Sequence, residues 1–378
     1  MRVAVLGAGY AGLRVARRLE RSLPGDVDLV VVDDTGTHVL QHEIHRVVRR
    51  PRIADAIEVP VADVLNRAQV RTARIERVDA EAGVATLGDG ERLDYDYAAV
   101  CLGATTAYYG LPGVEEHSLP LKSIADARAI RDAALEVAET GGRVVVGGAG
   151  LSGIQVAGEL TALAREEGVE DDVTVTLVEQ LDDVAPSFAP NFRDAVREAL
   201  VDAGVDVRTG RTVTEATADE LRFEDGSLAH DLFVWTGGIA GSEALTGERP
   251  VVRDTLRHSD STFVVGDAGR VVDADGKAVP ASAAAATREA RVAADNIAAL
   301  VDHDWTDPTA FEPRLDHYRF DVPGWVVSVG ERAVAQVGPK ILTGPPAKAL
   351  KTGIGVDQLA SVAELERVVE FVEEELSA

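Results

Sequence analysis

The 378-residue chain is poor in cysteine and in long apolar runs, and each shortage excludes a class of protein. Cys101 is its single cysteine, which excludes an intrachain disulfide and a cysteine-rich metal site. No run reaches the roughly 18 apolar residues of a transmembrane helix. The first residues lead directly into a short apolar stretch and glycines, which is not the pattern of a signal peptide. A reducing cytoplasm fits these features.

Positive charge is also scarce. Lysine and arginine total 38 against 64 aspartates and glutamates, so the formal net charge is −26 and the pI is about 4.7. This balance argues against nucleic acid as a partner, because phosphate binding needs clustered Lys and Arg. Many acids with few lysines are typical of a halophilic protein, since high salt screens the self-repulsion of the surface. The alternative is an ordinary acidic cytoplasmic protein.

Glycines near the start of the chain form a pattern that is typical of dinucleotide binding. A short apolar strand leads into Gly7-Ala8-Gly9-Tyr10-Ala11-Gly12, and a helical pattern continues to Leu19. A second apolar strand, 27–32, ends at Asp33, about 20 residues after the glycines. The order of strand, glycine turn, helix, strand and acid raises this motif above a chance match.

The same pattern recurs later in the chain. An apolar strand from 143 leads into Gly148, Gly150 and Gly153, a helical pattern follows, and strand 173–178 ends at Glu179. In both copies the first glycine allows the tight turn, the second lets a pyrophosphate approach, and the third lets helix and strand pack closely. The helix N-terminus then offers unpaired N–H groups to the phosphates. Two complete copies predict two dinucleotide sites.

Each motif ends in an acid, which indicates the kind of dinucleotide. Asp33 and Glu179 can accept hydrogen bonds from an adenosine ribose, and an acid repels a 2′-phosphate, so NADH is favoured over NADPH. Two sites indicate a flavin and a nicotinamide with hydride transfer between them. The strand-end sequence Gly266-Asp267 supports a flavin, because this Asp can bind the ribityl hydroxyls. A plain turn or helix cap is the alternative for Asp267.

We therefore expect an α/β fold with two interleaved Rossmann-like domains and a small C-terminal region. The expected boundaries are 1–108 with 240–301 for the FAD domain, 109–239 for the NAD domain and 302–378 for the C-terminal region. Within the first domain, the alternating stretch 68–87 predicts a small antiparallel excursion.

The residues expected to bind the cofactors lie at the glycine turns and at strand ends. For FAD they are Gly7, Gly9, Ala11, Gly12, Asp33, Asp34, Gly103, Ala104, Gly266 and Asp267. For NADH they are Gly148, Gly150, Ser152, Gly153 and Glu179. Gly237 and Gly238 are expected to let the backbone approach either the nicotinamide or the flavin. No catalytic side chain and no metal ligand is expected, because hydride transfer depends on positioning and on the electronics of the cofactors.

Through these residues the chain resembles the FAD/NAD(P)-binding pyridine nucleotide oxidoreductases, the flavoproteins with two dinucleotide-binding domains, and among them the type II NADH dehydrogenases. The resemblance extends from Met1 to about residue 300 and rests on both glycine motifs and on five further segments: 95–103, 110–113, 121–126, 234–238 and 264–267. It implies hydride transfer from NADH to FAD and electron delivery to a quinone. A soluble NAD(P)H-dependent reductase with a protein or small-molecule acceptor, and an FAD-binding redox sensor without turnover, are the alternatives.

The chain departs from this family at three places. Residues 283–290 read Ala-Ala-Ala-Ala-Thr-Arg-Glu-Ala, with alanine and arginine where the family has glutamines near the flavin and the quinone. Gln155 stands where the family tends to have a glutamate near the nicotinamide. The loop 38–45 contains three histidines in place of a proline- and tyrosine-containing version.

Three residue types could suggest other chemistry. Cys101 lies in an apolar strand, where an inert buried thiol is expected, so disulfide chemistry is not expected. His38, His42 and His45 have the spacing of one helix face. A metal site, a position over the flavin or at the mouth of the acceptor site, and a surface or packing role are all open for them. Core packing is the interpretation of Trp235.

The C-terminal segment reverses the charge of the chain. Residues 332–356 contain no Asp or Glu and carry Arg332, Lys340, Lys348 and Lys351, which suggests peripheral contact with the inner face of the membrane. A solvated loop is the alternative. Beyond it, an apolar helical face predicts packing or a homodimer: Val362, Leu365, Val369, Val372 and Leu376.

Overall fold

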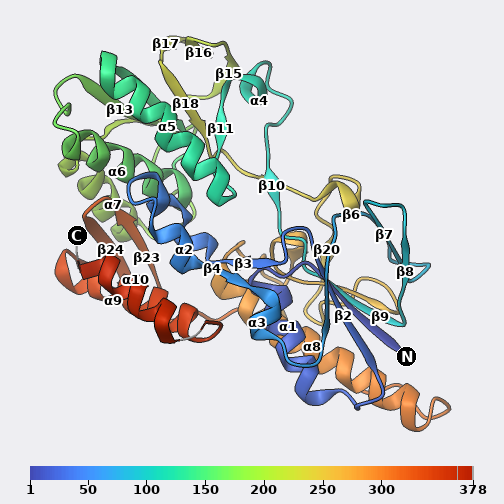
Figure 1. The fold of residues 1–378 in the computed structure, drawn as a ribbon. Helices are drawn as coiled ribbons and strands as arrows, with labels where there is room; N and C mark the ends of the chain where they lie inside the picture. Colours follow the sequence, from blue (N-terminus) through green and yellow to red (C-terminus); the bar gives the residue numbers. More distant parts are fainter. Residues whose placement is uncertain (364, 377–378) are drawn as a thin grey trace. The chain divides into compact units, whose positions relative to one another are not determined.

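A computed structural model gives the fold, and it describes residues 1–363 and 365–376 (Figure 1). The chain forms two compact units, each assembled from separate segments. Unit 1 contains Met1–Val39, Glu58–Thr105 and Ala240–Val322. Unit 2 contains Leu40–Ile57, Thr106–Ile239 and Pro323–Ala378. The expected α/β class is confirmed.

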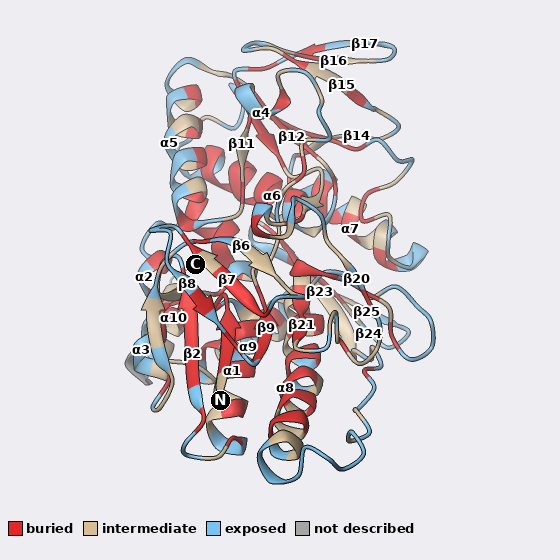
Figure 2. Cartoon of the chain, turned by 90° about the vertical axis from the view of Figure 1, so that its right-hand side faces the viewer, coloured by how far each residue is buried: buried red, intermediate tan, exposed pale blue. Residues whose placement is uncertain are grey.

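Unit 1 is built on a five-stranded parallel sheet with the order β21-β9-β1-β2-β5. The bounds are β1 (Arg2–Leu6), β2 (Asp28–Asp33), β5 (Gln69–Thr72), β9 (Tyr97–Val100) and β21 (Thr262–Val264). The three central strands are buried along nearly their whole length (Figure 2). Their continuous apolar runs follow from this burial, since helices cover both faces of a parallel sheet.

Helices α1 (Tyr10–Ser22) and α8 (Ala283–Thr306) pack against each other in unit 1. The buried face of α8 is rich in alanine, which lets helices approach closely. Ser282 caps α8 by accepting a hydrogen bond from the Ala285 amide at 3.2 Å. The remaining helices of the unit are α3 (Val61–Val64), η2 (Glu243–Leu245) and η3 (Gly266–Ala268).

The stretch 68–87 divides between two sheets. Strand β5 extends the parallel sheet, whereas β6 (Ile75–Asp79), β7 (Val84–Leu87) and β8 (Arg92–Asp94) form the expected antiparallel excursion. The shorter strands of unit 1 are β3 (Thr37–Val39), β4 (Glu58–Pro60), β20 (Val251–Val252) and β22 (Arg270–Val271).

Unit 2 repeats the architecture with the parallel order β11-β18-β12-β13-β14. The bounds are β11 (Leu119–Pro120), β12 (Gly142–Gly147), β13 (Val173–Val178), β14 (Asp206–Arg208) and β18 (Leu232–Trp235). Its helices are α4 (Val114–His117), α5 (Ile124–Thr140), α6 (Leu151–Glu166) and α7 (Pro190–Asp202). An antiparallel sheet contains β15 (Val213–Ala216), β16 (Glu220–Phe223) and β17 (Gly226–Ala229). The two-residue strands β10 (Thr105–Thr106) and β19 (Ile239–Ala240) each span a position where the chain passes from one unit to the other.

Two further segments complete unit 2, and both depart from the expected domain boundaries. The segment 40–57, expected with the first domain, carries η1 (Gln41–Val48) and α2 (Ile53–Ile57), and η1 packs against α5 and α6. Its apolar side chains Ile44, Val47 and Val48 are buried there. Residues 323–378 also join unit 2, as β23 (Gly324–Val329), β24 (Arg332–Val337), β25 (Lys340–Thr343), α9 (Pro345–Ala360) and α10 (Leu365–Leu376).

The buried face of α10 differs from the expected one. Val369 is 47% exposed, whereas Phe371 is fully buried. A separation of two residues turns the helix by about 200°, so these side chains lie on opposite faces. The aromatic ring decides the packing because it fills the space left by Gly355 of α9. Val362 lies before the helix, and the side chains of Leu365 and Leu376 lie outside the described residues.

Candidate dinucleotide-binding sites

The two glycine turns have the same backbone geometry. Gly7 and Gly148 have φ angles of 99° and 95°, a conformation that side chains disfavour. A side chain on Gly12 would overlap the Gly7 carbonyl oxygen, and one on Gly153 would overlap that of Gly148. The first and third glycines of each motif are therefore required by the packing of the protein itself.

The second glycine of each motif is different. Gly9 and Gly150 precede α1 and α6 with extended backbones, and no described side chain caps either helix. A Cβ atom on either glycine would meet no described protein atom within 4 Å. The fold leaves both positions open, so only a bound group would need a glycine there. The N–H groups at a helix start point toward the space in front of it and suit a pyrophosphate.

The acids at the ends of β2 and β13 accept hydrogen bonds from the backbone of the two glycine turns. Asp33 is 8% exposed and accepts a hydrogen bond from the Ala8 amide at 2.7 Å. Glu179 is 7% exposed and accepts one from the Ala149 amide, also at 2.7 Å. Each carboxylate thus holds the backbone of its glycine turn. Binding of the ribose by these acids stays a prediction.

The other residues predicted to bind FAD lie at ends of strands in unit 1. Gly266 and Asp267 follow β21, and a Cβ atom on Gly266 would lie 3.3 Å from that of Ala11. This places the Gly-Asp turn beside the first helix start. Gly103 and Ala104 follow β9, and Gly103 has a φ of 65°. Asp34 is exposed after β2.

The second turn is brought close to the end of β18. A Cβ atom on Gly148 would lie 2.8 Å from the Gly237 Cα atom, and one on Gly237 would overlap the Trp235 ring. Trp235 is 6% exposed and donates its Nε1–H to the Ala107 carbonyl at 2.8 Å, which confirms its packing role. Gly238 has a φ of 156°, and Ser152 is an exposed residue of α6.

Sequence reasoning missed Glu289, a buried acid on α8. Its side chain accepts a hydrogen bond from the Gly266 amide at 2.7 Å and lines a hollow of about 10 Å³ together with Asp267. Burial, with Asp267 nearby, raises the pKa of Glu289 to about 7. The sequence signal that could have indicated a buried acid is its position among the alanines of a predicted helix face. Glu289 positions a residue predicted to contact the flavin.

This pKa makes the stability of the protein depend on pH. The unfolded chain loses the Glu289 proton near pH 4.5, whereas the folded chain keeps it to about pH 7. Folding therefore becomes less favourable as the pH rises between these values, by about 3 kcal/mol. Relative to wild type, Glu289→Gln should gain stability across this range in urea unfolding, and exposed Glu81→Gln is the control. A difference that does not change with pH would contradict this.

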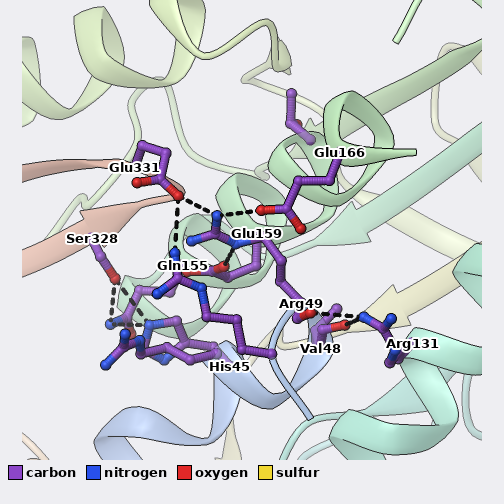
Figure 3. A network of polar contacts seen from close by, with 12 residues as sticks. His45, Val48, Arg49, Arg131, Gln155, Glu159, Glu166, Ser328 and Glu331 are labelled. Atoms are coloured by element: carbon purple, nitrogen blue, oxygen red, sulfur yellow. Dashed lines mark hydrogen bonds and ion pairs between the residues drawn. The ribbon is translucent and has the colours of Figure 1, made fainter. Parts of the chain in front are cut away.

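The three histidines do not share a helix. His38 lies in β3 of unit 1, and His42 and His45 lie in the 3₁₀ helix η1 of unit 2. Figure 3 shows His45 beside Gln155 and Ser328, and its Nε2 atom lies 2.9 Å from the Ser328 hydroxyl and 3.3 Å from the Gln155 amide. Burial, with Lys351 nearby, holds the pKa of His45 well below its ordinary value. Gln155 thus contacts this buried histidine.

Cys101 is buried beside the first glycine turn. A Cβ atom on Gly12 would lie 3.2 Å from its Cβ atom. Burial raises the pKa of the thiol far above its ordinary value, which favours the unreactive protonated form. This agrees with the prediction of an inert cysteine.

Comparison with known proteins identifies the family. Residues 1–290 match the family described as Pyridine nucleotide-disulphide oxidoreductase. The chain belongs to this family. Two relatives named Type II NADH:quinone oxidoreductase are 25% identical to it: that of Staphylococcus aureus, with 93% of each chain covered, and that of Staphylococcus saprophyticus, with 83% of this chain and 86% of the relative covered. As a pyridine nucleotide oxidoreductase, the protein is an enzyme.

Two solved structures share the fold of this oxidoreductase. NDH2 from Plasmodium falciparum in complex with NADH has a TM-score of 0.84 at 13% identity, covering 99% of this chain and 97% of its own. The sulfide:quinone oxidoreductase of Aquifex aeolicus has a TM-score of 0.77 at 19% identity, covering 93% and 89%. The fold expected from the two glycine motifs is thereby confirmed.

Proposed function

We propose that this oxidoreductase binds FAD and NADH and transfers electrons from NADH to a quinone. The observation that carries the proposal is the pair of matching glycine turns, one in each unit, whose second glycines are open. The names of the Staphylococcus relatives support NADH and a quinone as substrates. When bound, FAD accepts a hydride and releases electrons.

The residues of the chain contribute binding and orientation. Gly9 would admit the FAD pyrophosphate to the start of α1, and Asp267 would bind the ribityl hydroxyls from the turn that Glu289 holds. In unit 2, Gly150 would admit the NADH pyrophosphate to α6. Glu179 would repel a 2′-phosphate, which favours NADH. No side-chain nucleophile is required.

One observation favours a second acceptor class. The first turns of α8 carry alanines and Arg288 where the resemblance leads one to expect glutamines near a quinone. A soluble reductase that serves a protein or small-molecule acceptor is therefore the alternative function.

Anaerobic titration of the yellow protein with NADH tests the proposal. We expect the flavin absorbance to bleach at about one NADH per flavin, because hydride transfer is a two-electron step. A quinone analogue added afterwards should restore the absorbance faster than ferredoxin does. Flavin that NADH leaves unbleached would contradict the enzyme function and indicate a binding protein. Faster recovery with ferredoxin would favour the second acceptor class.

Fewer positive charges of residues 332–356 are available for membrane contact than the sequence suggests, because three of the four cations form ion pairs. Lys351 is 8% exposed and lies 2.7 Å from the Glu43 carboxylate, Lys348 pairs with Glu331, and Arg332 pairs with Asp202. Among the described helices, none is long and apolar enough to cross a bilayer. Peripheral contact would rest on exposed Lys340 and neighbouring apolar side chains, and cosedimentation with anionic vesicles tests it.

A homodimer stays a prediction that light scattering can test.

A further inference from the structure

Tyr109 of unit 2 has a backbone conformation that a tyrosine disfavours. Its φ angle is 55° and that of Gly110 is 65°, and the Leu111 amide donates a hydrogen bond to the Tyr108 carbonyl at 3.0 Å. Two central residues with positive φ are typical of a type I′ turn, which favours Asn, Asp and Gly. A bulky side chain at such a position is strained. The turn would therefore form more readily with another residue at position 109.

Packing of the fold does not explain the tyrosine either. Its neighbours Tyr108 and Leu111 pack against the buried core of unit 2, which includes Phe233 and Trp235. Tyr109 itself is 67% exposed. Strain of this kind persists where the surrounding structure imposes it, and it gathers at binding sites. The strain at Tyr109 thus points to a role in binding rather than in folding.

The Tyr109 side chain lies at the end of β18. Its hydroxyl donates a hydrogen bond to the Gly237 carbonyl at 3.3 Å, and a Cβ atom on Gly238 would overlap the hydroxyl oxygen. A Cβ atom on Gly148 of the second glycine turn would lie 2.8 Å from the Gly237 Cα atom. Contacts within unit 2 therefore hold the exposed ring beside the predicted NADH site.

The strand order shows which part of the dinucleotide passes Tyr109. Strand β12 leads into the second glycine turn and lies between β13 and β18. A dinucleotide binds across the carboxyl ends of the strands at the point where the strand order reverses. Glu179, which follows β13, is predicted to bind the adenosine ribose. The adenosine half would then lie toward β13 and the nicotinamide half toward β18, where Tyr109 lies.

We infer that Tyr109 binds the nicotinamide half of NADH, a role that rests on the proposed function. Its exposed ring offers an aromatic surface on which the nicotinamide or its ribose can pack. Its hydroxyl can accept a hydrogen bond from the ligand while it donates one to the Gly237 carbonyl. The turn and this hydrogen bond hold the ring in place before the substrate arrives, which lowers the entropic cost of binding.

Binding of NAD⁺ to the FAD-containing protein tests this inference, because NAD⁺ cannot reduce the oxidised flavin and no turnover interferes. In isothermal titration, Tyr109→Ala should weaken NAD⁺ binding about 3- to 10-fold, through the loss of one aromatic contact. ADP should bind as it does to wild type, since it lacks the nicotinamide half. Tyr109→Phe should keep most of the affinity because it retains the ring. Phe311→Ala, which removes an exposed aromatic ring of unit 1, is the control and should leave both ligands unaffected.

Stability separates this role from a structural one. Tyr109→Asn should keep or raise the midpoint of urea unfolding, because asparagine tolerates the left-handed conformation, while NAD⁺ binding weakens as in Tyr109→Ala. A lowered midpoint in Tyr109→Asn, unchanged NAD⁺ binding in Tyr109→Ala, or equal weakening of NAD⁺ and ADP would overturn the inference. Wild-type protein that binds neither NAD⁺ nor ADP would instead overturn the proposed function.

Discussion

Replacing Gly150 by alanine should raise the KM for NADH about 10- to 100-fold while the protein stays folded. The new methyl group meets no described protein atom within 4 Å, so the fold should tolerate it. It would occupy the space through which a pyrophosphate reaches the start of α6. Loss of charge-assisted hydrogen bonds from the backbone amides costs roughly 1.5–3 kcal/mol each, which gives this range.

Steady-state kinetics with varied NADH measures this effect. Gly353→Ala is the matched control, because Gly353 is an exposed residue of unit 2 where a Cβ atom likewise meets no described atom within 4 Å. In unit 1, Gly9→Ala should instead lower the flavin content, with exposed Gly25→Ala as its control. Equal KM values for the Gly150 and Gly353 variants would show that no pyrophosphate binds at α6.

Replacing Arg49 by methionine should destabilise the protein by about 3–5 kcal/mol. Burial opposes the charge of Arg49, but Glu159 and Glu331 outweigh it and raise the pKa of the guanidinium. Without this cation, Glu159 would be left as a buried charge with 2% of its side chain exposed. Breaking one side of a buried pair is costly, whereas removing both sides is not. The double variant Arg49→Met with Glu159→Leu should therefore recover most of the loss.

Urea unfolding measures both variants. The matched control is Arg71→Met, because Arg71 pairs with Glu91 at 2.5 Å in a solvent-exposed position. Exposed pairs contribute at most about 1 kcal/mol, so this control should stay near wild type. If Arg49→Met resembled the control, the buried pair would not stabilise unit 2.

The parallel sheets and glycine turns could be predicted because their causes are local in sequence. Gly7 and Gly12 are five residues apart, and the steric requirement that joins them is visible in the motif. Arg49 is different, because its partners Glu159 and Glu331 are 110 and 282 residues away. Nothing near Arg49 in the sequence distinguishes a buried arginine from a solvated one.

The same reason explains the errors at the C-terminal end. Lys351 was expected at the surface because no acid is near it in sequence, but its partner Glu43 is 308 residues away. The apolar face of α10 was judged from its own residues, whereas the glycine that admits Phe371 belongs to α9. Glu289 was missed because its raised pKa depends on burial in the folded unit and on the nearby Asp267 carboxylate. In each case the side chain is buried against residues that are distant in sequence.

The segmented make-up of the two units constrains how the chain folds during synthesis. Unit 1 cannot complete its parallel sheet until β21, at Thr262–Val264, has left the ribosome. Unit 2 begins with residues 40–57 and still lacks β23, β24 and β25 until after Thr343. Most of the chain is therefore translated before either core can close, with apolar strands exposed to aggregation. An abundance of acidic side chains would keep such a nascent chain soluble by mutual repulsion.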